Sequence, residues 1–309
     1  MITTVVLNPA VDKIYFVDNF QVGGLFRIKE TITSAGGKGI NVSRVIRALG
    51  EEVLSLGFKG GRTGEWLVEQ LGELGAMTEF IEVEGESRTN NNIIDRINGT
   101  ETEVLEVGPL ITEKNIEEFI SIYRKALKKT KIVVCSGGIP AGAKDDIYKI
   151  LIDEAKKHDI KVILDASGEV LKRGIEAKPY LIKPNLRELG GLVNKELKEI
   201  SDVLEACRYV QREGVDLVLA SLGEKGAILV SKDRAFRVHV PSIKVVNTIG
   251  SGDSMVAGVA VALSKGFDLK EVLRLGAACG VNNAQYQAIG VVNRDEVYKL
   301  IEEIRIEEI

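Results

Sequence analysis

The sequence has few cysteines and no pattern that would pair them. Its 309 residues include three, Cys135, Cys207 and Cys279, and no Cys-x-x-Cys occurs. An odd number of widely spaced cysteines argues against a disulfide framework and against a zinc site. We therefore expect a protein of a reducing compartment, the cytoplasm.

Membrane and nucleic-acid binding are disfavoured by what is missing. No apolar stretch reaches the roughly 18 residues of a membrane span. No run of five or more Lys/Arg occurs, and the formal net charge is −4, so no basic footprint for nucleic acid is expected. The two histidines, His158 and His239, lie far apart and outside every motif, which argues against a metal pair or a Ser-His-Asp triad.

Most of the chain has the pattern of an α/β protein. Short apolar runs at 131–136, 162–164, 180–182 and 217–219 predict strands, and several are separated by segments with helical apolar spacing, such as 115–129. Short strands alternating with helices predict βα units and a mainly parallel sheet.

Two early regions read differently. Residues 12–33 and 87–107 alternate apolar and polar residues, and Asn98-Gly99 is a hairpin signal. We interpret them as a small β-sheet lid inserted into a single α/β domain that spans residues 1–309. Such a lid would cover the carboxyl ends of the parallel strands, where open α/β sheets bind ligands.

A first glycine loop, Gly36-Gly-Lys-Gly-Ile-Asn41, opens a helix. The amides at a helix start attract anions, and Lys38 adds a positive charge. Asn41 can reach a hydroxyl group. The loop is neither a P-loop nor Gly-x-Gly-x-x-Gly; the absence of the latter argues against a dinucleotide-dependent oxidoreductase. The alternative is that the glycines only permit a tight turn.

A second glycine loop, Thr248-Ile-Gly-Ser-Gly-Asp-Ser254, precedes an apolar helix. Asp253 has two interpretations: an N-cap of that helix, or a base beside the amides of Gly250, Ser251 and Gly252. In the second interpretation the amides bind a transferring phosphoryl group while Asp253 accepts a proton, because phosphoryl transfer depends mainly on positioning and charge stabilisation.

Together these loops resemble the signatures of the PfkB family of carbohydrate kinases, within the ribokinase-like superfamily. Three further motifs, Asn8 to Asp12, Lys183 to Glu188 and Ser221 to Gly226, follow in the family's order. The resemblance implies a ribokinase-like three-layer α/β/α fold with a mainly parallel central sheet and a small β-sheet lid. It also implies ATP and Mg²⁺ as cofactors and Asp253 as the catalytic base.

The resemblance assigns the remaining site residues. Substrate contacts fall on Asp12, Arg27, Gly37, Lys38, Asn41, Arg88, Asn90 and Ser136. ATP contacts fall on Lys183, Asn185, Ser221, Gly223, Gly226 and Asn282, and Glu188 is associated with magnesium through water. We expect Asp165, which ends a predicted strand, to orient Lys183 rather than to touch a ligand.

Within the family, one branch phosphorylates ketohexoses that already carry a phosphate. The basic residues Arg27, Lys38 and Arg88 resemble that branch's phosphate site, and arginine suits phosphate through its paired donors. The implied reaction is that of a 1-phosphofructokinase, fructose 1-phosphate to fructose 1,6-bisphosphate. The alternative is phosphorylation of tagatose 6-phosphate to tagatose 1,6-bisphosphate, as in tagatose-6-phosphate kinase.

Other interpretations stay open at this point. The lid arginines can be solvated charges, and a further basic lid residue of the branch has no match at 101–106. A sugar-phosphate sensor without turnover would need a damaged base or anion site, and neither is visible. Exposed lid strands also favour a homodimer through the lid.

Overall fold

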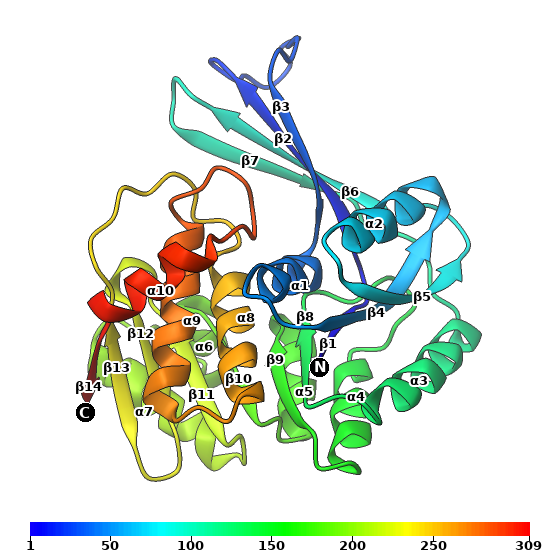
Figure 1. Ribbon diagram of the computed structural model, residues 1–309. Helices are drawn as coiled ribbons and strands as arrows, with labels where there is room; N and C mark the ends of the chain where they lie inside the picture. The colour runs from blue at the N-terminus through cyan, green and yellow to red at the C-terminus, as the bar shows by residue number, and fades with distance from the viewer.

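The computed structural model describes residues 1–309, which form a ten-stranded sheet with helices on both faces and a separate four-stranded sheet (Figure 1). The large sheet has the order β14-β13-β12-β11-β10-β9-β8-β1-β4-β5. Its strands are β1 Ile2–Val6, β4 Val53–Gly60, β5 Met77–Val83, β8 Ile132–Ser136, β9 Lys161–Asp165, β10 Leu181–Ile182, β11 Leu217–Ser221, β12 Ala227–Val230, β13 Ala235–His239 and β14 Arg305–Glu308.

The helices cover the two faces of this sheet (Figure 1). On one face lie α1 Lys38–Ala48, α2 Gly61–Glu73, α8 Ser251–Ser264, α9 Leu269–Asn283 and α10 Arg294–Glu303. On the other lie α3 Glu113–Leu127, α4 Ile147–Lys156, α5 Gly168–Glu176, α6 Leu186–Val193 and α7 Ile200–Arg212. A 3₁₀ turn, η1, spans Gly223–Lys225.

Two hydrophobic clusters of similar size, 39 and 37 buried residues, fill the two interfaces. Alternate residues of strand β8 contribute to the two clusters. Ile132 and Val134 belong to the first cluster, whereas Val133 and Cys135 belong to the second. Burial on both faces is why such strands read as continuous apolar runs. The predicted fold class is confirmed.

The sheet is parallel from β5 to β11 and antiparallel from β11 to β14. This antiparallel edge is absent from the sequence prediction. Strands β12 and β13 are short apolar runs joined by a tight turn at 231–234. Their composition resembles that of the parallel strands, so pattern alone did not separate them.

The small sheet forms a lid with the order β3-β2-β6-β7. Its strands are β2 Ala10–Val17, β3 Thr31–Gly36, β6 Arg88–Asp95 and β7 Thr100–Leu105. The sheet projects from the body at the carboxyl end of β1 (Figure 1). The predicted lid segments, 12–33 and 87–107, overlap these strands, although residues 18–30 form an exposed connection rather than a strand. Assignment of body and lid to one domain stays a prediction.

Candidate active site

A cavity of about 1280 Å³ lies between the lid and the carboxyl ends of the parallel strands. It brings together most of the residues selected from the sequence. They are Asp12, Gly37, Lys38, Asn41, Arg88, Asn90, Lys183, Asn185, Ser221, Gly223, Gly226, Gly250, Ser251, Gly252 and Asp253. These residues come from both glycine loops, the lid and the ends of β10 and β11, so segments far apart in the chain meet in one place.

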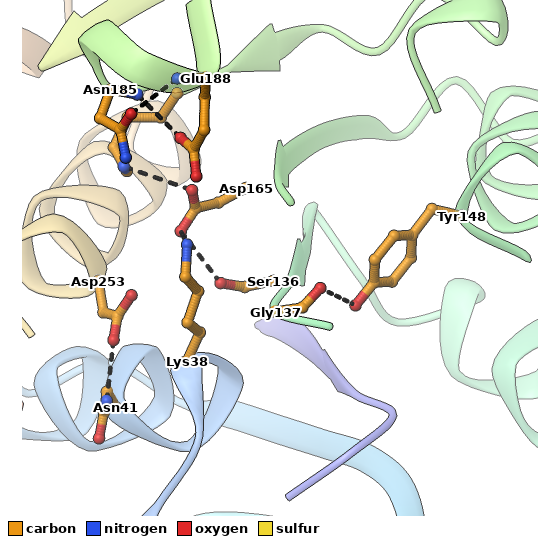
Figure 2. Close-up of polar contacts among 10 residues, drawn as sticks. Lys38, Asn41, Ser136, Gly137, Tyr148, Asp165, Asn185, Glu188 and Asp253 are labelled. Atoms are coloured by element: carbon orange, nitrogen blue, oxygen red, sulfur yellow. Dashed lines mark hydrogen bonds and ion pairs between the residues drawn. The ribbon is translucent and has the colours of Figure 1, made fainter. Parts of the chain in front are cut away.

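Asp253 lies in the first turn of α8 but does not cap it. The N-cap is Gly250, whose φ of 81° is left-handed, a conformation in which glycine has no steric cost. Asp253 is 7% exposed, and its Oδ2 accepts a hydrogen bond of 2.8 Å from Nδ2 of Asn41 (Figure 2). The carboxylate thus points across to α1, and the N-cap interpretation is wrong.

The start of α8 has unused amide donors. The amide of Ser251 donates to the carbonyl of Thr248 at 3.2 Å, whereas the amides of Gly250, Gly252 and Asp253 have no main-chain acceptor. Free amides at a helix start bind anions, and the helix dipole adds to this. The anion site predicted from the amides of Gly250, Ser251 and Gly252 therefore still has three donors. The free amide of Asp253 takes the place of the bonded amide of Ser251.

The Asp253 carboxyl is poised for proton transfer. Burial raises its pKa to about 6, with the charge of Asp165 acting in the same direction. The charge of Lys38 and the hydrogen bond from Asn41 act in the opposite direction. A carboxyl with such a pKa is ionised at neutral pH and is a stronger base than an exposed one.

Two lysines meet at Asp165, which is fully buried at the end of β9. Its Oδ2 lies 3.2 Å from Nζ of Lys38 (Figure 2), and its Oδ1 lies 3.3 Å from Nζ of Lys183. The pKa of Asp165 is lowered, because the two ammonium groups outweigh the effect of burial. The contact with Lys183 was expected from the sequence, whereas the contact with Lys38 was not.

The lysine pair adjoins the anion site. A Cβ placed on Gly252 would lie 3.2 Å from Nζ of Lys183. Burial alone would lower the pKa of Lys38, but the charges of Asp165 and Asp253 outweigh it and raise that pKa. The Lys38 ammonium group therefore stays protonated at neutral pH, and the side chain of Lys183 lies next to the free amides.

Asp12 connects the lid with the first glycine loop. Its Oδ1 accepts a hydrogen bond of 2.8 Å from Nδ2 of Asn90 on the neighbouring lid strand. A Cβ on Gly36 would lie 1.8 Å from the Oδ2 atom of Asp12, so only glycine fits there. Burial raises the pKa of Asp12, and the bond from Asn90 opposes it.

A smaller side cavity of about 170 Å³ shares Gly37, Lys38 and Arg88 with the main one. Ser136, at the end of β8, lines this side cavity and not the main one. The Arg88 guanidinium is held by the carbonyl of Asn8, which accepts from Nε at 3.3 Å and from Nη2 at 3.2 Å. Two cations and a hydroxyl at one small recess suit an anionic group.

Three selected residues do not line either cavity. Arg27 is exposed on the connection between β2 and β3. Asn282 is fully buried on α9, where its Oδ1 accepts from the amide of Asn293 at 2.7 Å and its Nδ2 donates to Glu296 at 2.9 Å. In the structure Asn282 fixes the segment before α10, and its contact with a nucleotide stays a prediction.

Glu188, the third, forms a capping box with Asn185 at the start of α6. Its Oε2 accepts from the amide of Asn185 at 2.9 Å (Figure 2), and its charge is one of those that raise the pKa of Lys38. No group of three or more His, Cys, Asp or Glu side chains is arranged to hold a metal ion. One carboxylate oxygen that is free of the cap fits a magnesium ion held mainly by phosphates and water.

Some cavity residues were missed from the sequence. From the lid these are Asn92, Glu103 and Leu105, and from the body an apolar group of Val240, Val245, Ala277, Val281 and Ala284. Asn90 and Asn92 lie two positions apart on β6, so strand alternation places both on the cavity side. That spacing was the available signal for Asn92.

Comparison with known proteins matches residues 5–293 to the pfkB family carbohydrate kinases. The chain belongs to this family. It is 38% identical over 312 residues to a tagatose-6-phosphate kinase from Staphylococcus epidermidis, covering 99% of this chain and all of that protein. No helix of the chain is both long enough and apolar enough to cross a membrane.

Solved structures agree with this membership. Phosphofructokinase-2 from Escherichia coli in complex with fructose-6-phosphate is 29% identical, with a TM-score of 0.89 and 98% of each chain covered. A protein described as a possible 1-phosphofructokinase from Thermotoga maritima is 30% identical, with a TM-score of 0.89, over 100% of this chain and 99% of that one. The sequence and the structural comparisons thus agree that this chain is a carbohydrate kinase of the pfkB family.

Proposed function

We propose that this kinase transfers the γ-phosphoryl group of ATP to a primary hydroxyl of a ketohexose monophosphate, with fructose 1-phosphate as the leading substrate. The product would be fructose 1,6-bisphosphate. The observation that carries the proposal is the arrangement of Asp253 beside the free amides of α8, with a second cationic recess at Arg88 opening from the same cavity.

Asp253 accepts the proton of the substrate hydroxyl as it attacks the γ-phosphorus. The buried carboxylate, held by Asn41, is a base near the pH at which it must work. The amides of Gly252 and Asp253 donate to the oxygens of the phosphoryl group during transfer. The ammonium groups of Lys38 and Lys183 neutralise charge that builds up on the phosphates.

The phosphate already on the sugar binds in the side cavity. Lys38 lines both cavities, so a substrate with its phosphate near Arg88 and Ser136 lies close to the reaction centre. Asp12, with its partner Asn90, accepts hydrogen bonds from sugar hydroxyls. A free sugar would leave the cations of the side cavity without a counter-ion.

ATP occupies the part of the main cavity lined by Asn185, Ser221, Gly223 and Gly226, with its base against the apolar group that includes Ala277 and Val281 of α9. Magnesium, when bound, supplies further neutralisation of the ATP phosphates, and Glu188 would hold it through water. The dependence on ATP and the three buried free thiols support a cytoplasmic enzyme.

Tagatose 6-phosphate is the second candidate substrate, favoured by the 38% identity to tagatose-6-phosphate kinase. The two sugars differ in configuration at C4 and in which end carries the phosphate. Steady-state kcat/KM for fructose 1-phosphate, tagatose 6-phosphate, fructose 6-phosphate and free fructose, with products identified by ³¹P NMR, tests the proposal. The highest value for fructose 1-phosphate is expected; a higher value for tagatose 6-phosphate makes that sugar the substrate, and turnover of free fructose alone contradicts the proposal.

A further inference from the structure

Arg44 joins three segments that surround the catalytic base. It lies on α1, three residues after Asn41, and its Nη1 donates to Oδ1 of Asn41 at 3.1 Å. The same nitrogen donates to the carbonyl of Ile289 at 2.9 Å, and Nη2 donates to the carbonyl of Ala35 at the base of the lid. Arg44 lines neither cavity, so it does not reach the ligands directly.

The bond to Asn41 determines how that amide is oriented. With its oxygen held by the Arg44 guanidinium, the amide presents its nitrogen to Oδ2 of Asp253 at 2.8 Å. A guanidinium only donates, so it selects the oxygen of an amide and never the nitrogen. A rotated amide would place its oxygen against the carboxylate and repel it.

The bond to Ile289 holds a segment that packs against the start of α8. A Cβ on Gly250 would lie 2.8 Å from both the amide nitrogen of Gly290 and Cγ2 of Ile289. A Cβ on Gly290 would lie 2.9 Å from Cβ of Asn41. The 289–290 segment is therefore wedged between Asn41 and the residue that begins α8, and Arg44 fixes it there.

We infer that Arg44 is a positioning residue, which acts through Asn41 and the 289–290 segment to hold the Asp253 carboxylate and the start of α8 in their working arrangement. The inference rests on the proposed role of Asp253 as the base. It adds a residue outside the cavity that connects the surroundings of Asp253 with Ala35, where the lid joins the body.

Loss of Arg44 should alter the titration of Asp253 without changing any group that faces it. Those charged groups are Lys38 on α1, Asp165 on β9 and Lys183 after β10, and Arg44 itself faces Asp12 on β2. Once the amide of Asn41 is free to rotate, its bond to the ionised carboxylate weakens. We expect the acid limb of the kcat–pH profile to move up by about one unit, and kcat to fall about 10²-fold.

The test compares Arg44→Met with Arg47→Met. Arg47 lies three residues further along, and its side chain also donates to main-chain carbonyls, those of Leu74 at 3.3 Å and Glu51 at 2.8 Å. Both variants lose such bonds, but only Arg44→Met should move the acid limb. Arg44→Lys keeps the charge beside Asp12 while losing the three-way contact. This variant should fold even if Arg44→Met does not. Its kcat–pH profile should show a smaller upward movement of the acid limb.

A double-mutant cycle shows whether Arg44 acts through Asn41. In an Asn41→Ala background, Arg44→Met should move the acid limb no further. The inference is overturned if Arg44→Met moves the acid limb equally in the unsubstituted chain and in the Asn41→Ala background. It is also overturned if a folded Arg44 variant leaves the acid limb unmoved. The proposed function fails separately, if the unsubstituted chain phosphorylates none of the ketohexose phosphates.

Discussion

The floor of the cavity and the lid above it hold their polar side chains in different ways. On the floor, Asp165 and Lys183 are buried at the ends of parallel strands, between the two large hydrophobic clusters. In the lid, Asp12 and Asn90 lie on a four-stranded sheet whose connections are exposed, with Val22 at 100% and Leu25 at 79% exposure.

The difference separates two tasks. Groups that act on the transferring phosphoryl need fixed positions, because small displacements cost much of the rate, and the packed floor provides them. The groups that we propose to recognise the sugar are on a thin sheet that has little core of its own. The comparison predicts that floor substitutions reduce catalysis or stability strongly, whereas exposed lid substitutions affect recognition and assembly.

The largest effect is expected at Asp253. Asp253→Asn keeps the shape and the neighbour Asn41 but cannot accept a proton, so kcat should fall about 10²–10⁴-fold. Binding of ATP, measured by calorimetry, should change little. A near-normal kcat would remove Asp253 from the mechanism. It would also contradict the proposal that residues on the floor of the cavity carry out the phosphoryl transfer.

Stability should show the same contrast between body and lid. Leu151 on α4 is fully buried, and Leu151→Ala should lower the free energy of unfolding by about 2–5 kcal/mol. The matched lid variant, Leu25→Ala, should change it by no more than about 0.5 kcal/mol. Urea unfolding of both variants measures this, and equal losses would show that the lid loop is packed as tightly as the body.

The pH dependence of kcat/KM tests the environment of the base. Because burial raises the pKa of Asp253 to about 6, the ionised base is lost as pH falls through that value. The rate should decrease about tenfold per unit below it. The raised pKa of Lys38 adds no basic limb near neutrality. A limb near the ordinary aspartate pKa of about 3.9 would show that another environment governs the rate.

The smallest effect on catalysis is expected from the outer lid. Its exposed apolar residues, Val22 and Leu25 among them, favour a homodimer through the lid. Sedimentation should show a dimer that Val22→Glu weakens, whereas Ile150→Glu on the body leaves it intact. A stable monomer at assay concentration would rule out this partner.

The sequence predicted the floor better than its surroundings. Both glycine loops were located because glycine and helix-start signals are local, and Asp253 followed from them. The apolar helix predicted to follow the second glycine loop begins inside that loop in the structure, at Ser251, so Asp253 lies in its first turn. Local patterns did not show that the helix starts within the glycine loop.

Long-range contacts account for the remaining differences. Arg27 and Arg88 look alike in sequence, yet only Arg88 is held at the cavity, by the carbonyl of Asn8. The contact of Asp165 with Lys38 and the three-way contact of Arg44 join residues far apart in the chain. Such pairings depend on how elements pack, which a single sequence does not state.

The measurement that tests the account most directly compares Arg88→Met with the unsubstituted enzyme on fructose 1-phosphate and on free fructose. Each lost hydrogen bond to the phosphate is expected to be worth about 1.5–3 kcal/mol. The substitution should therefore lower kcat/KM for fructose 1-phosphate by about 10- to 10²-fold or more, while the weak activity on free fructose hardly changes. Equal slowing of both substrates would contradict the account, because Arg88 would then support Asn8 and the fold instead of recognising the phosphate.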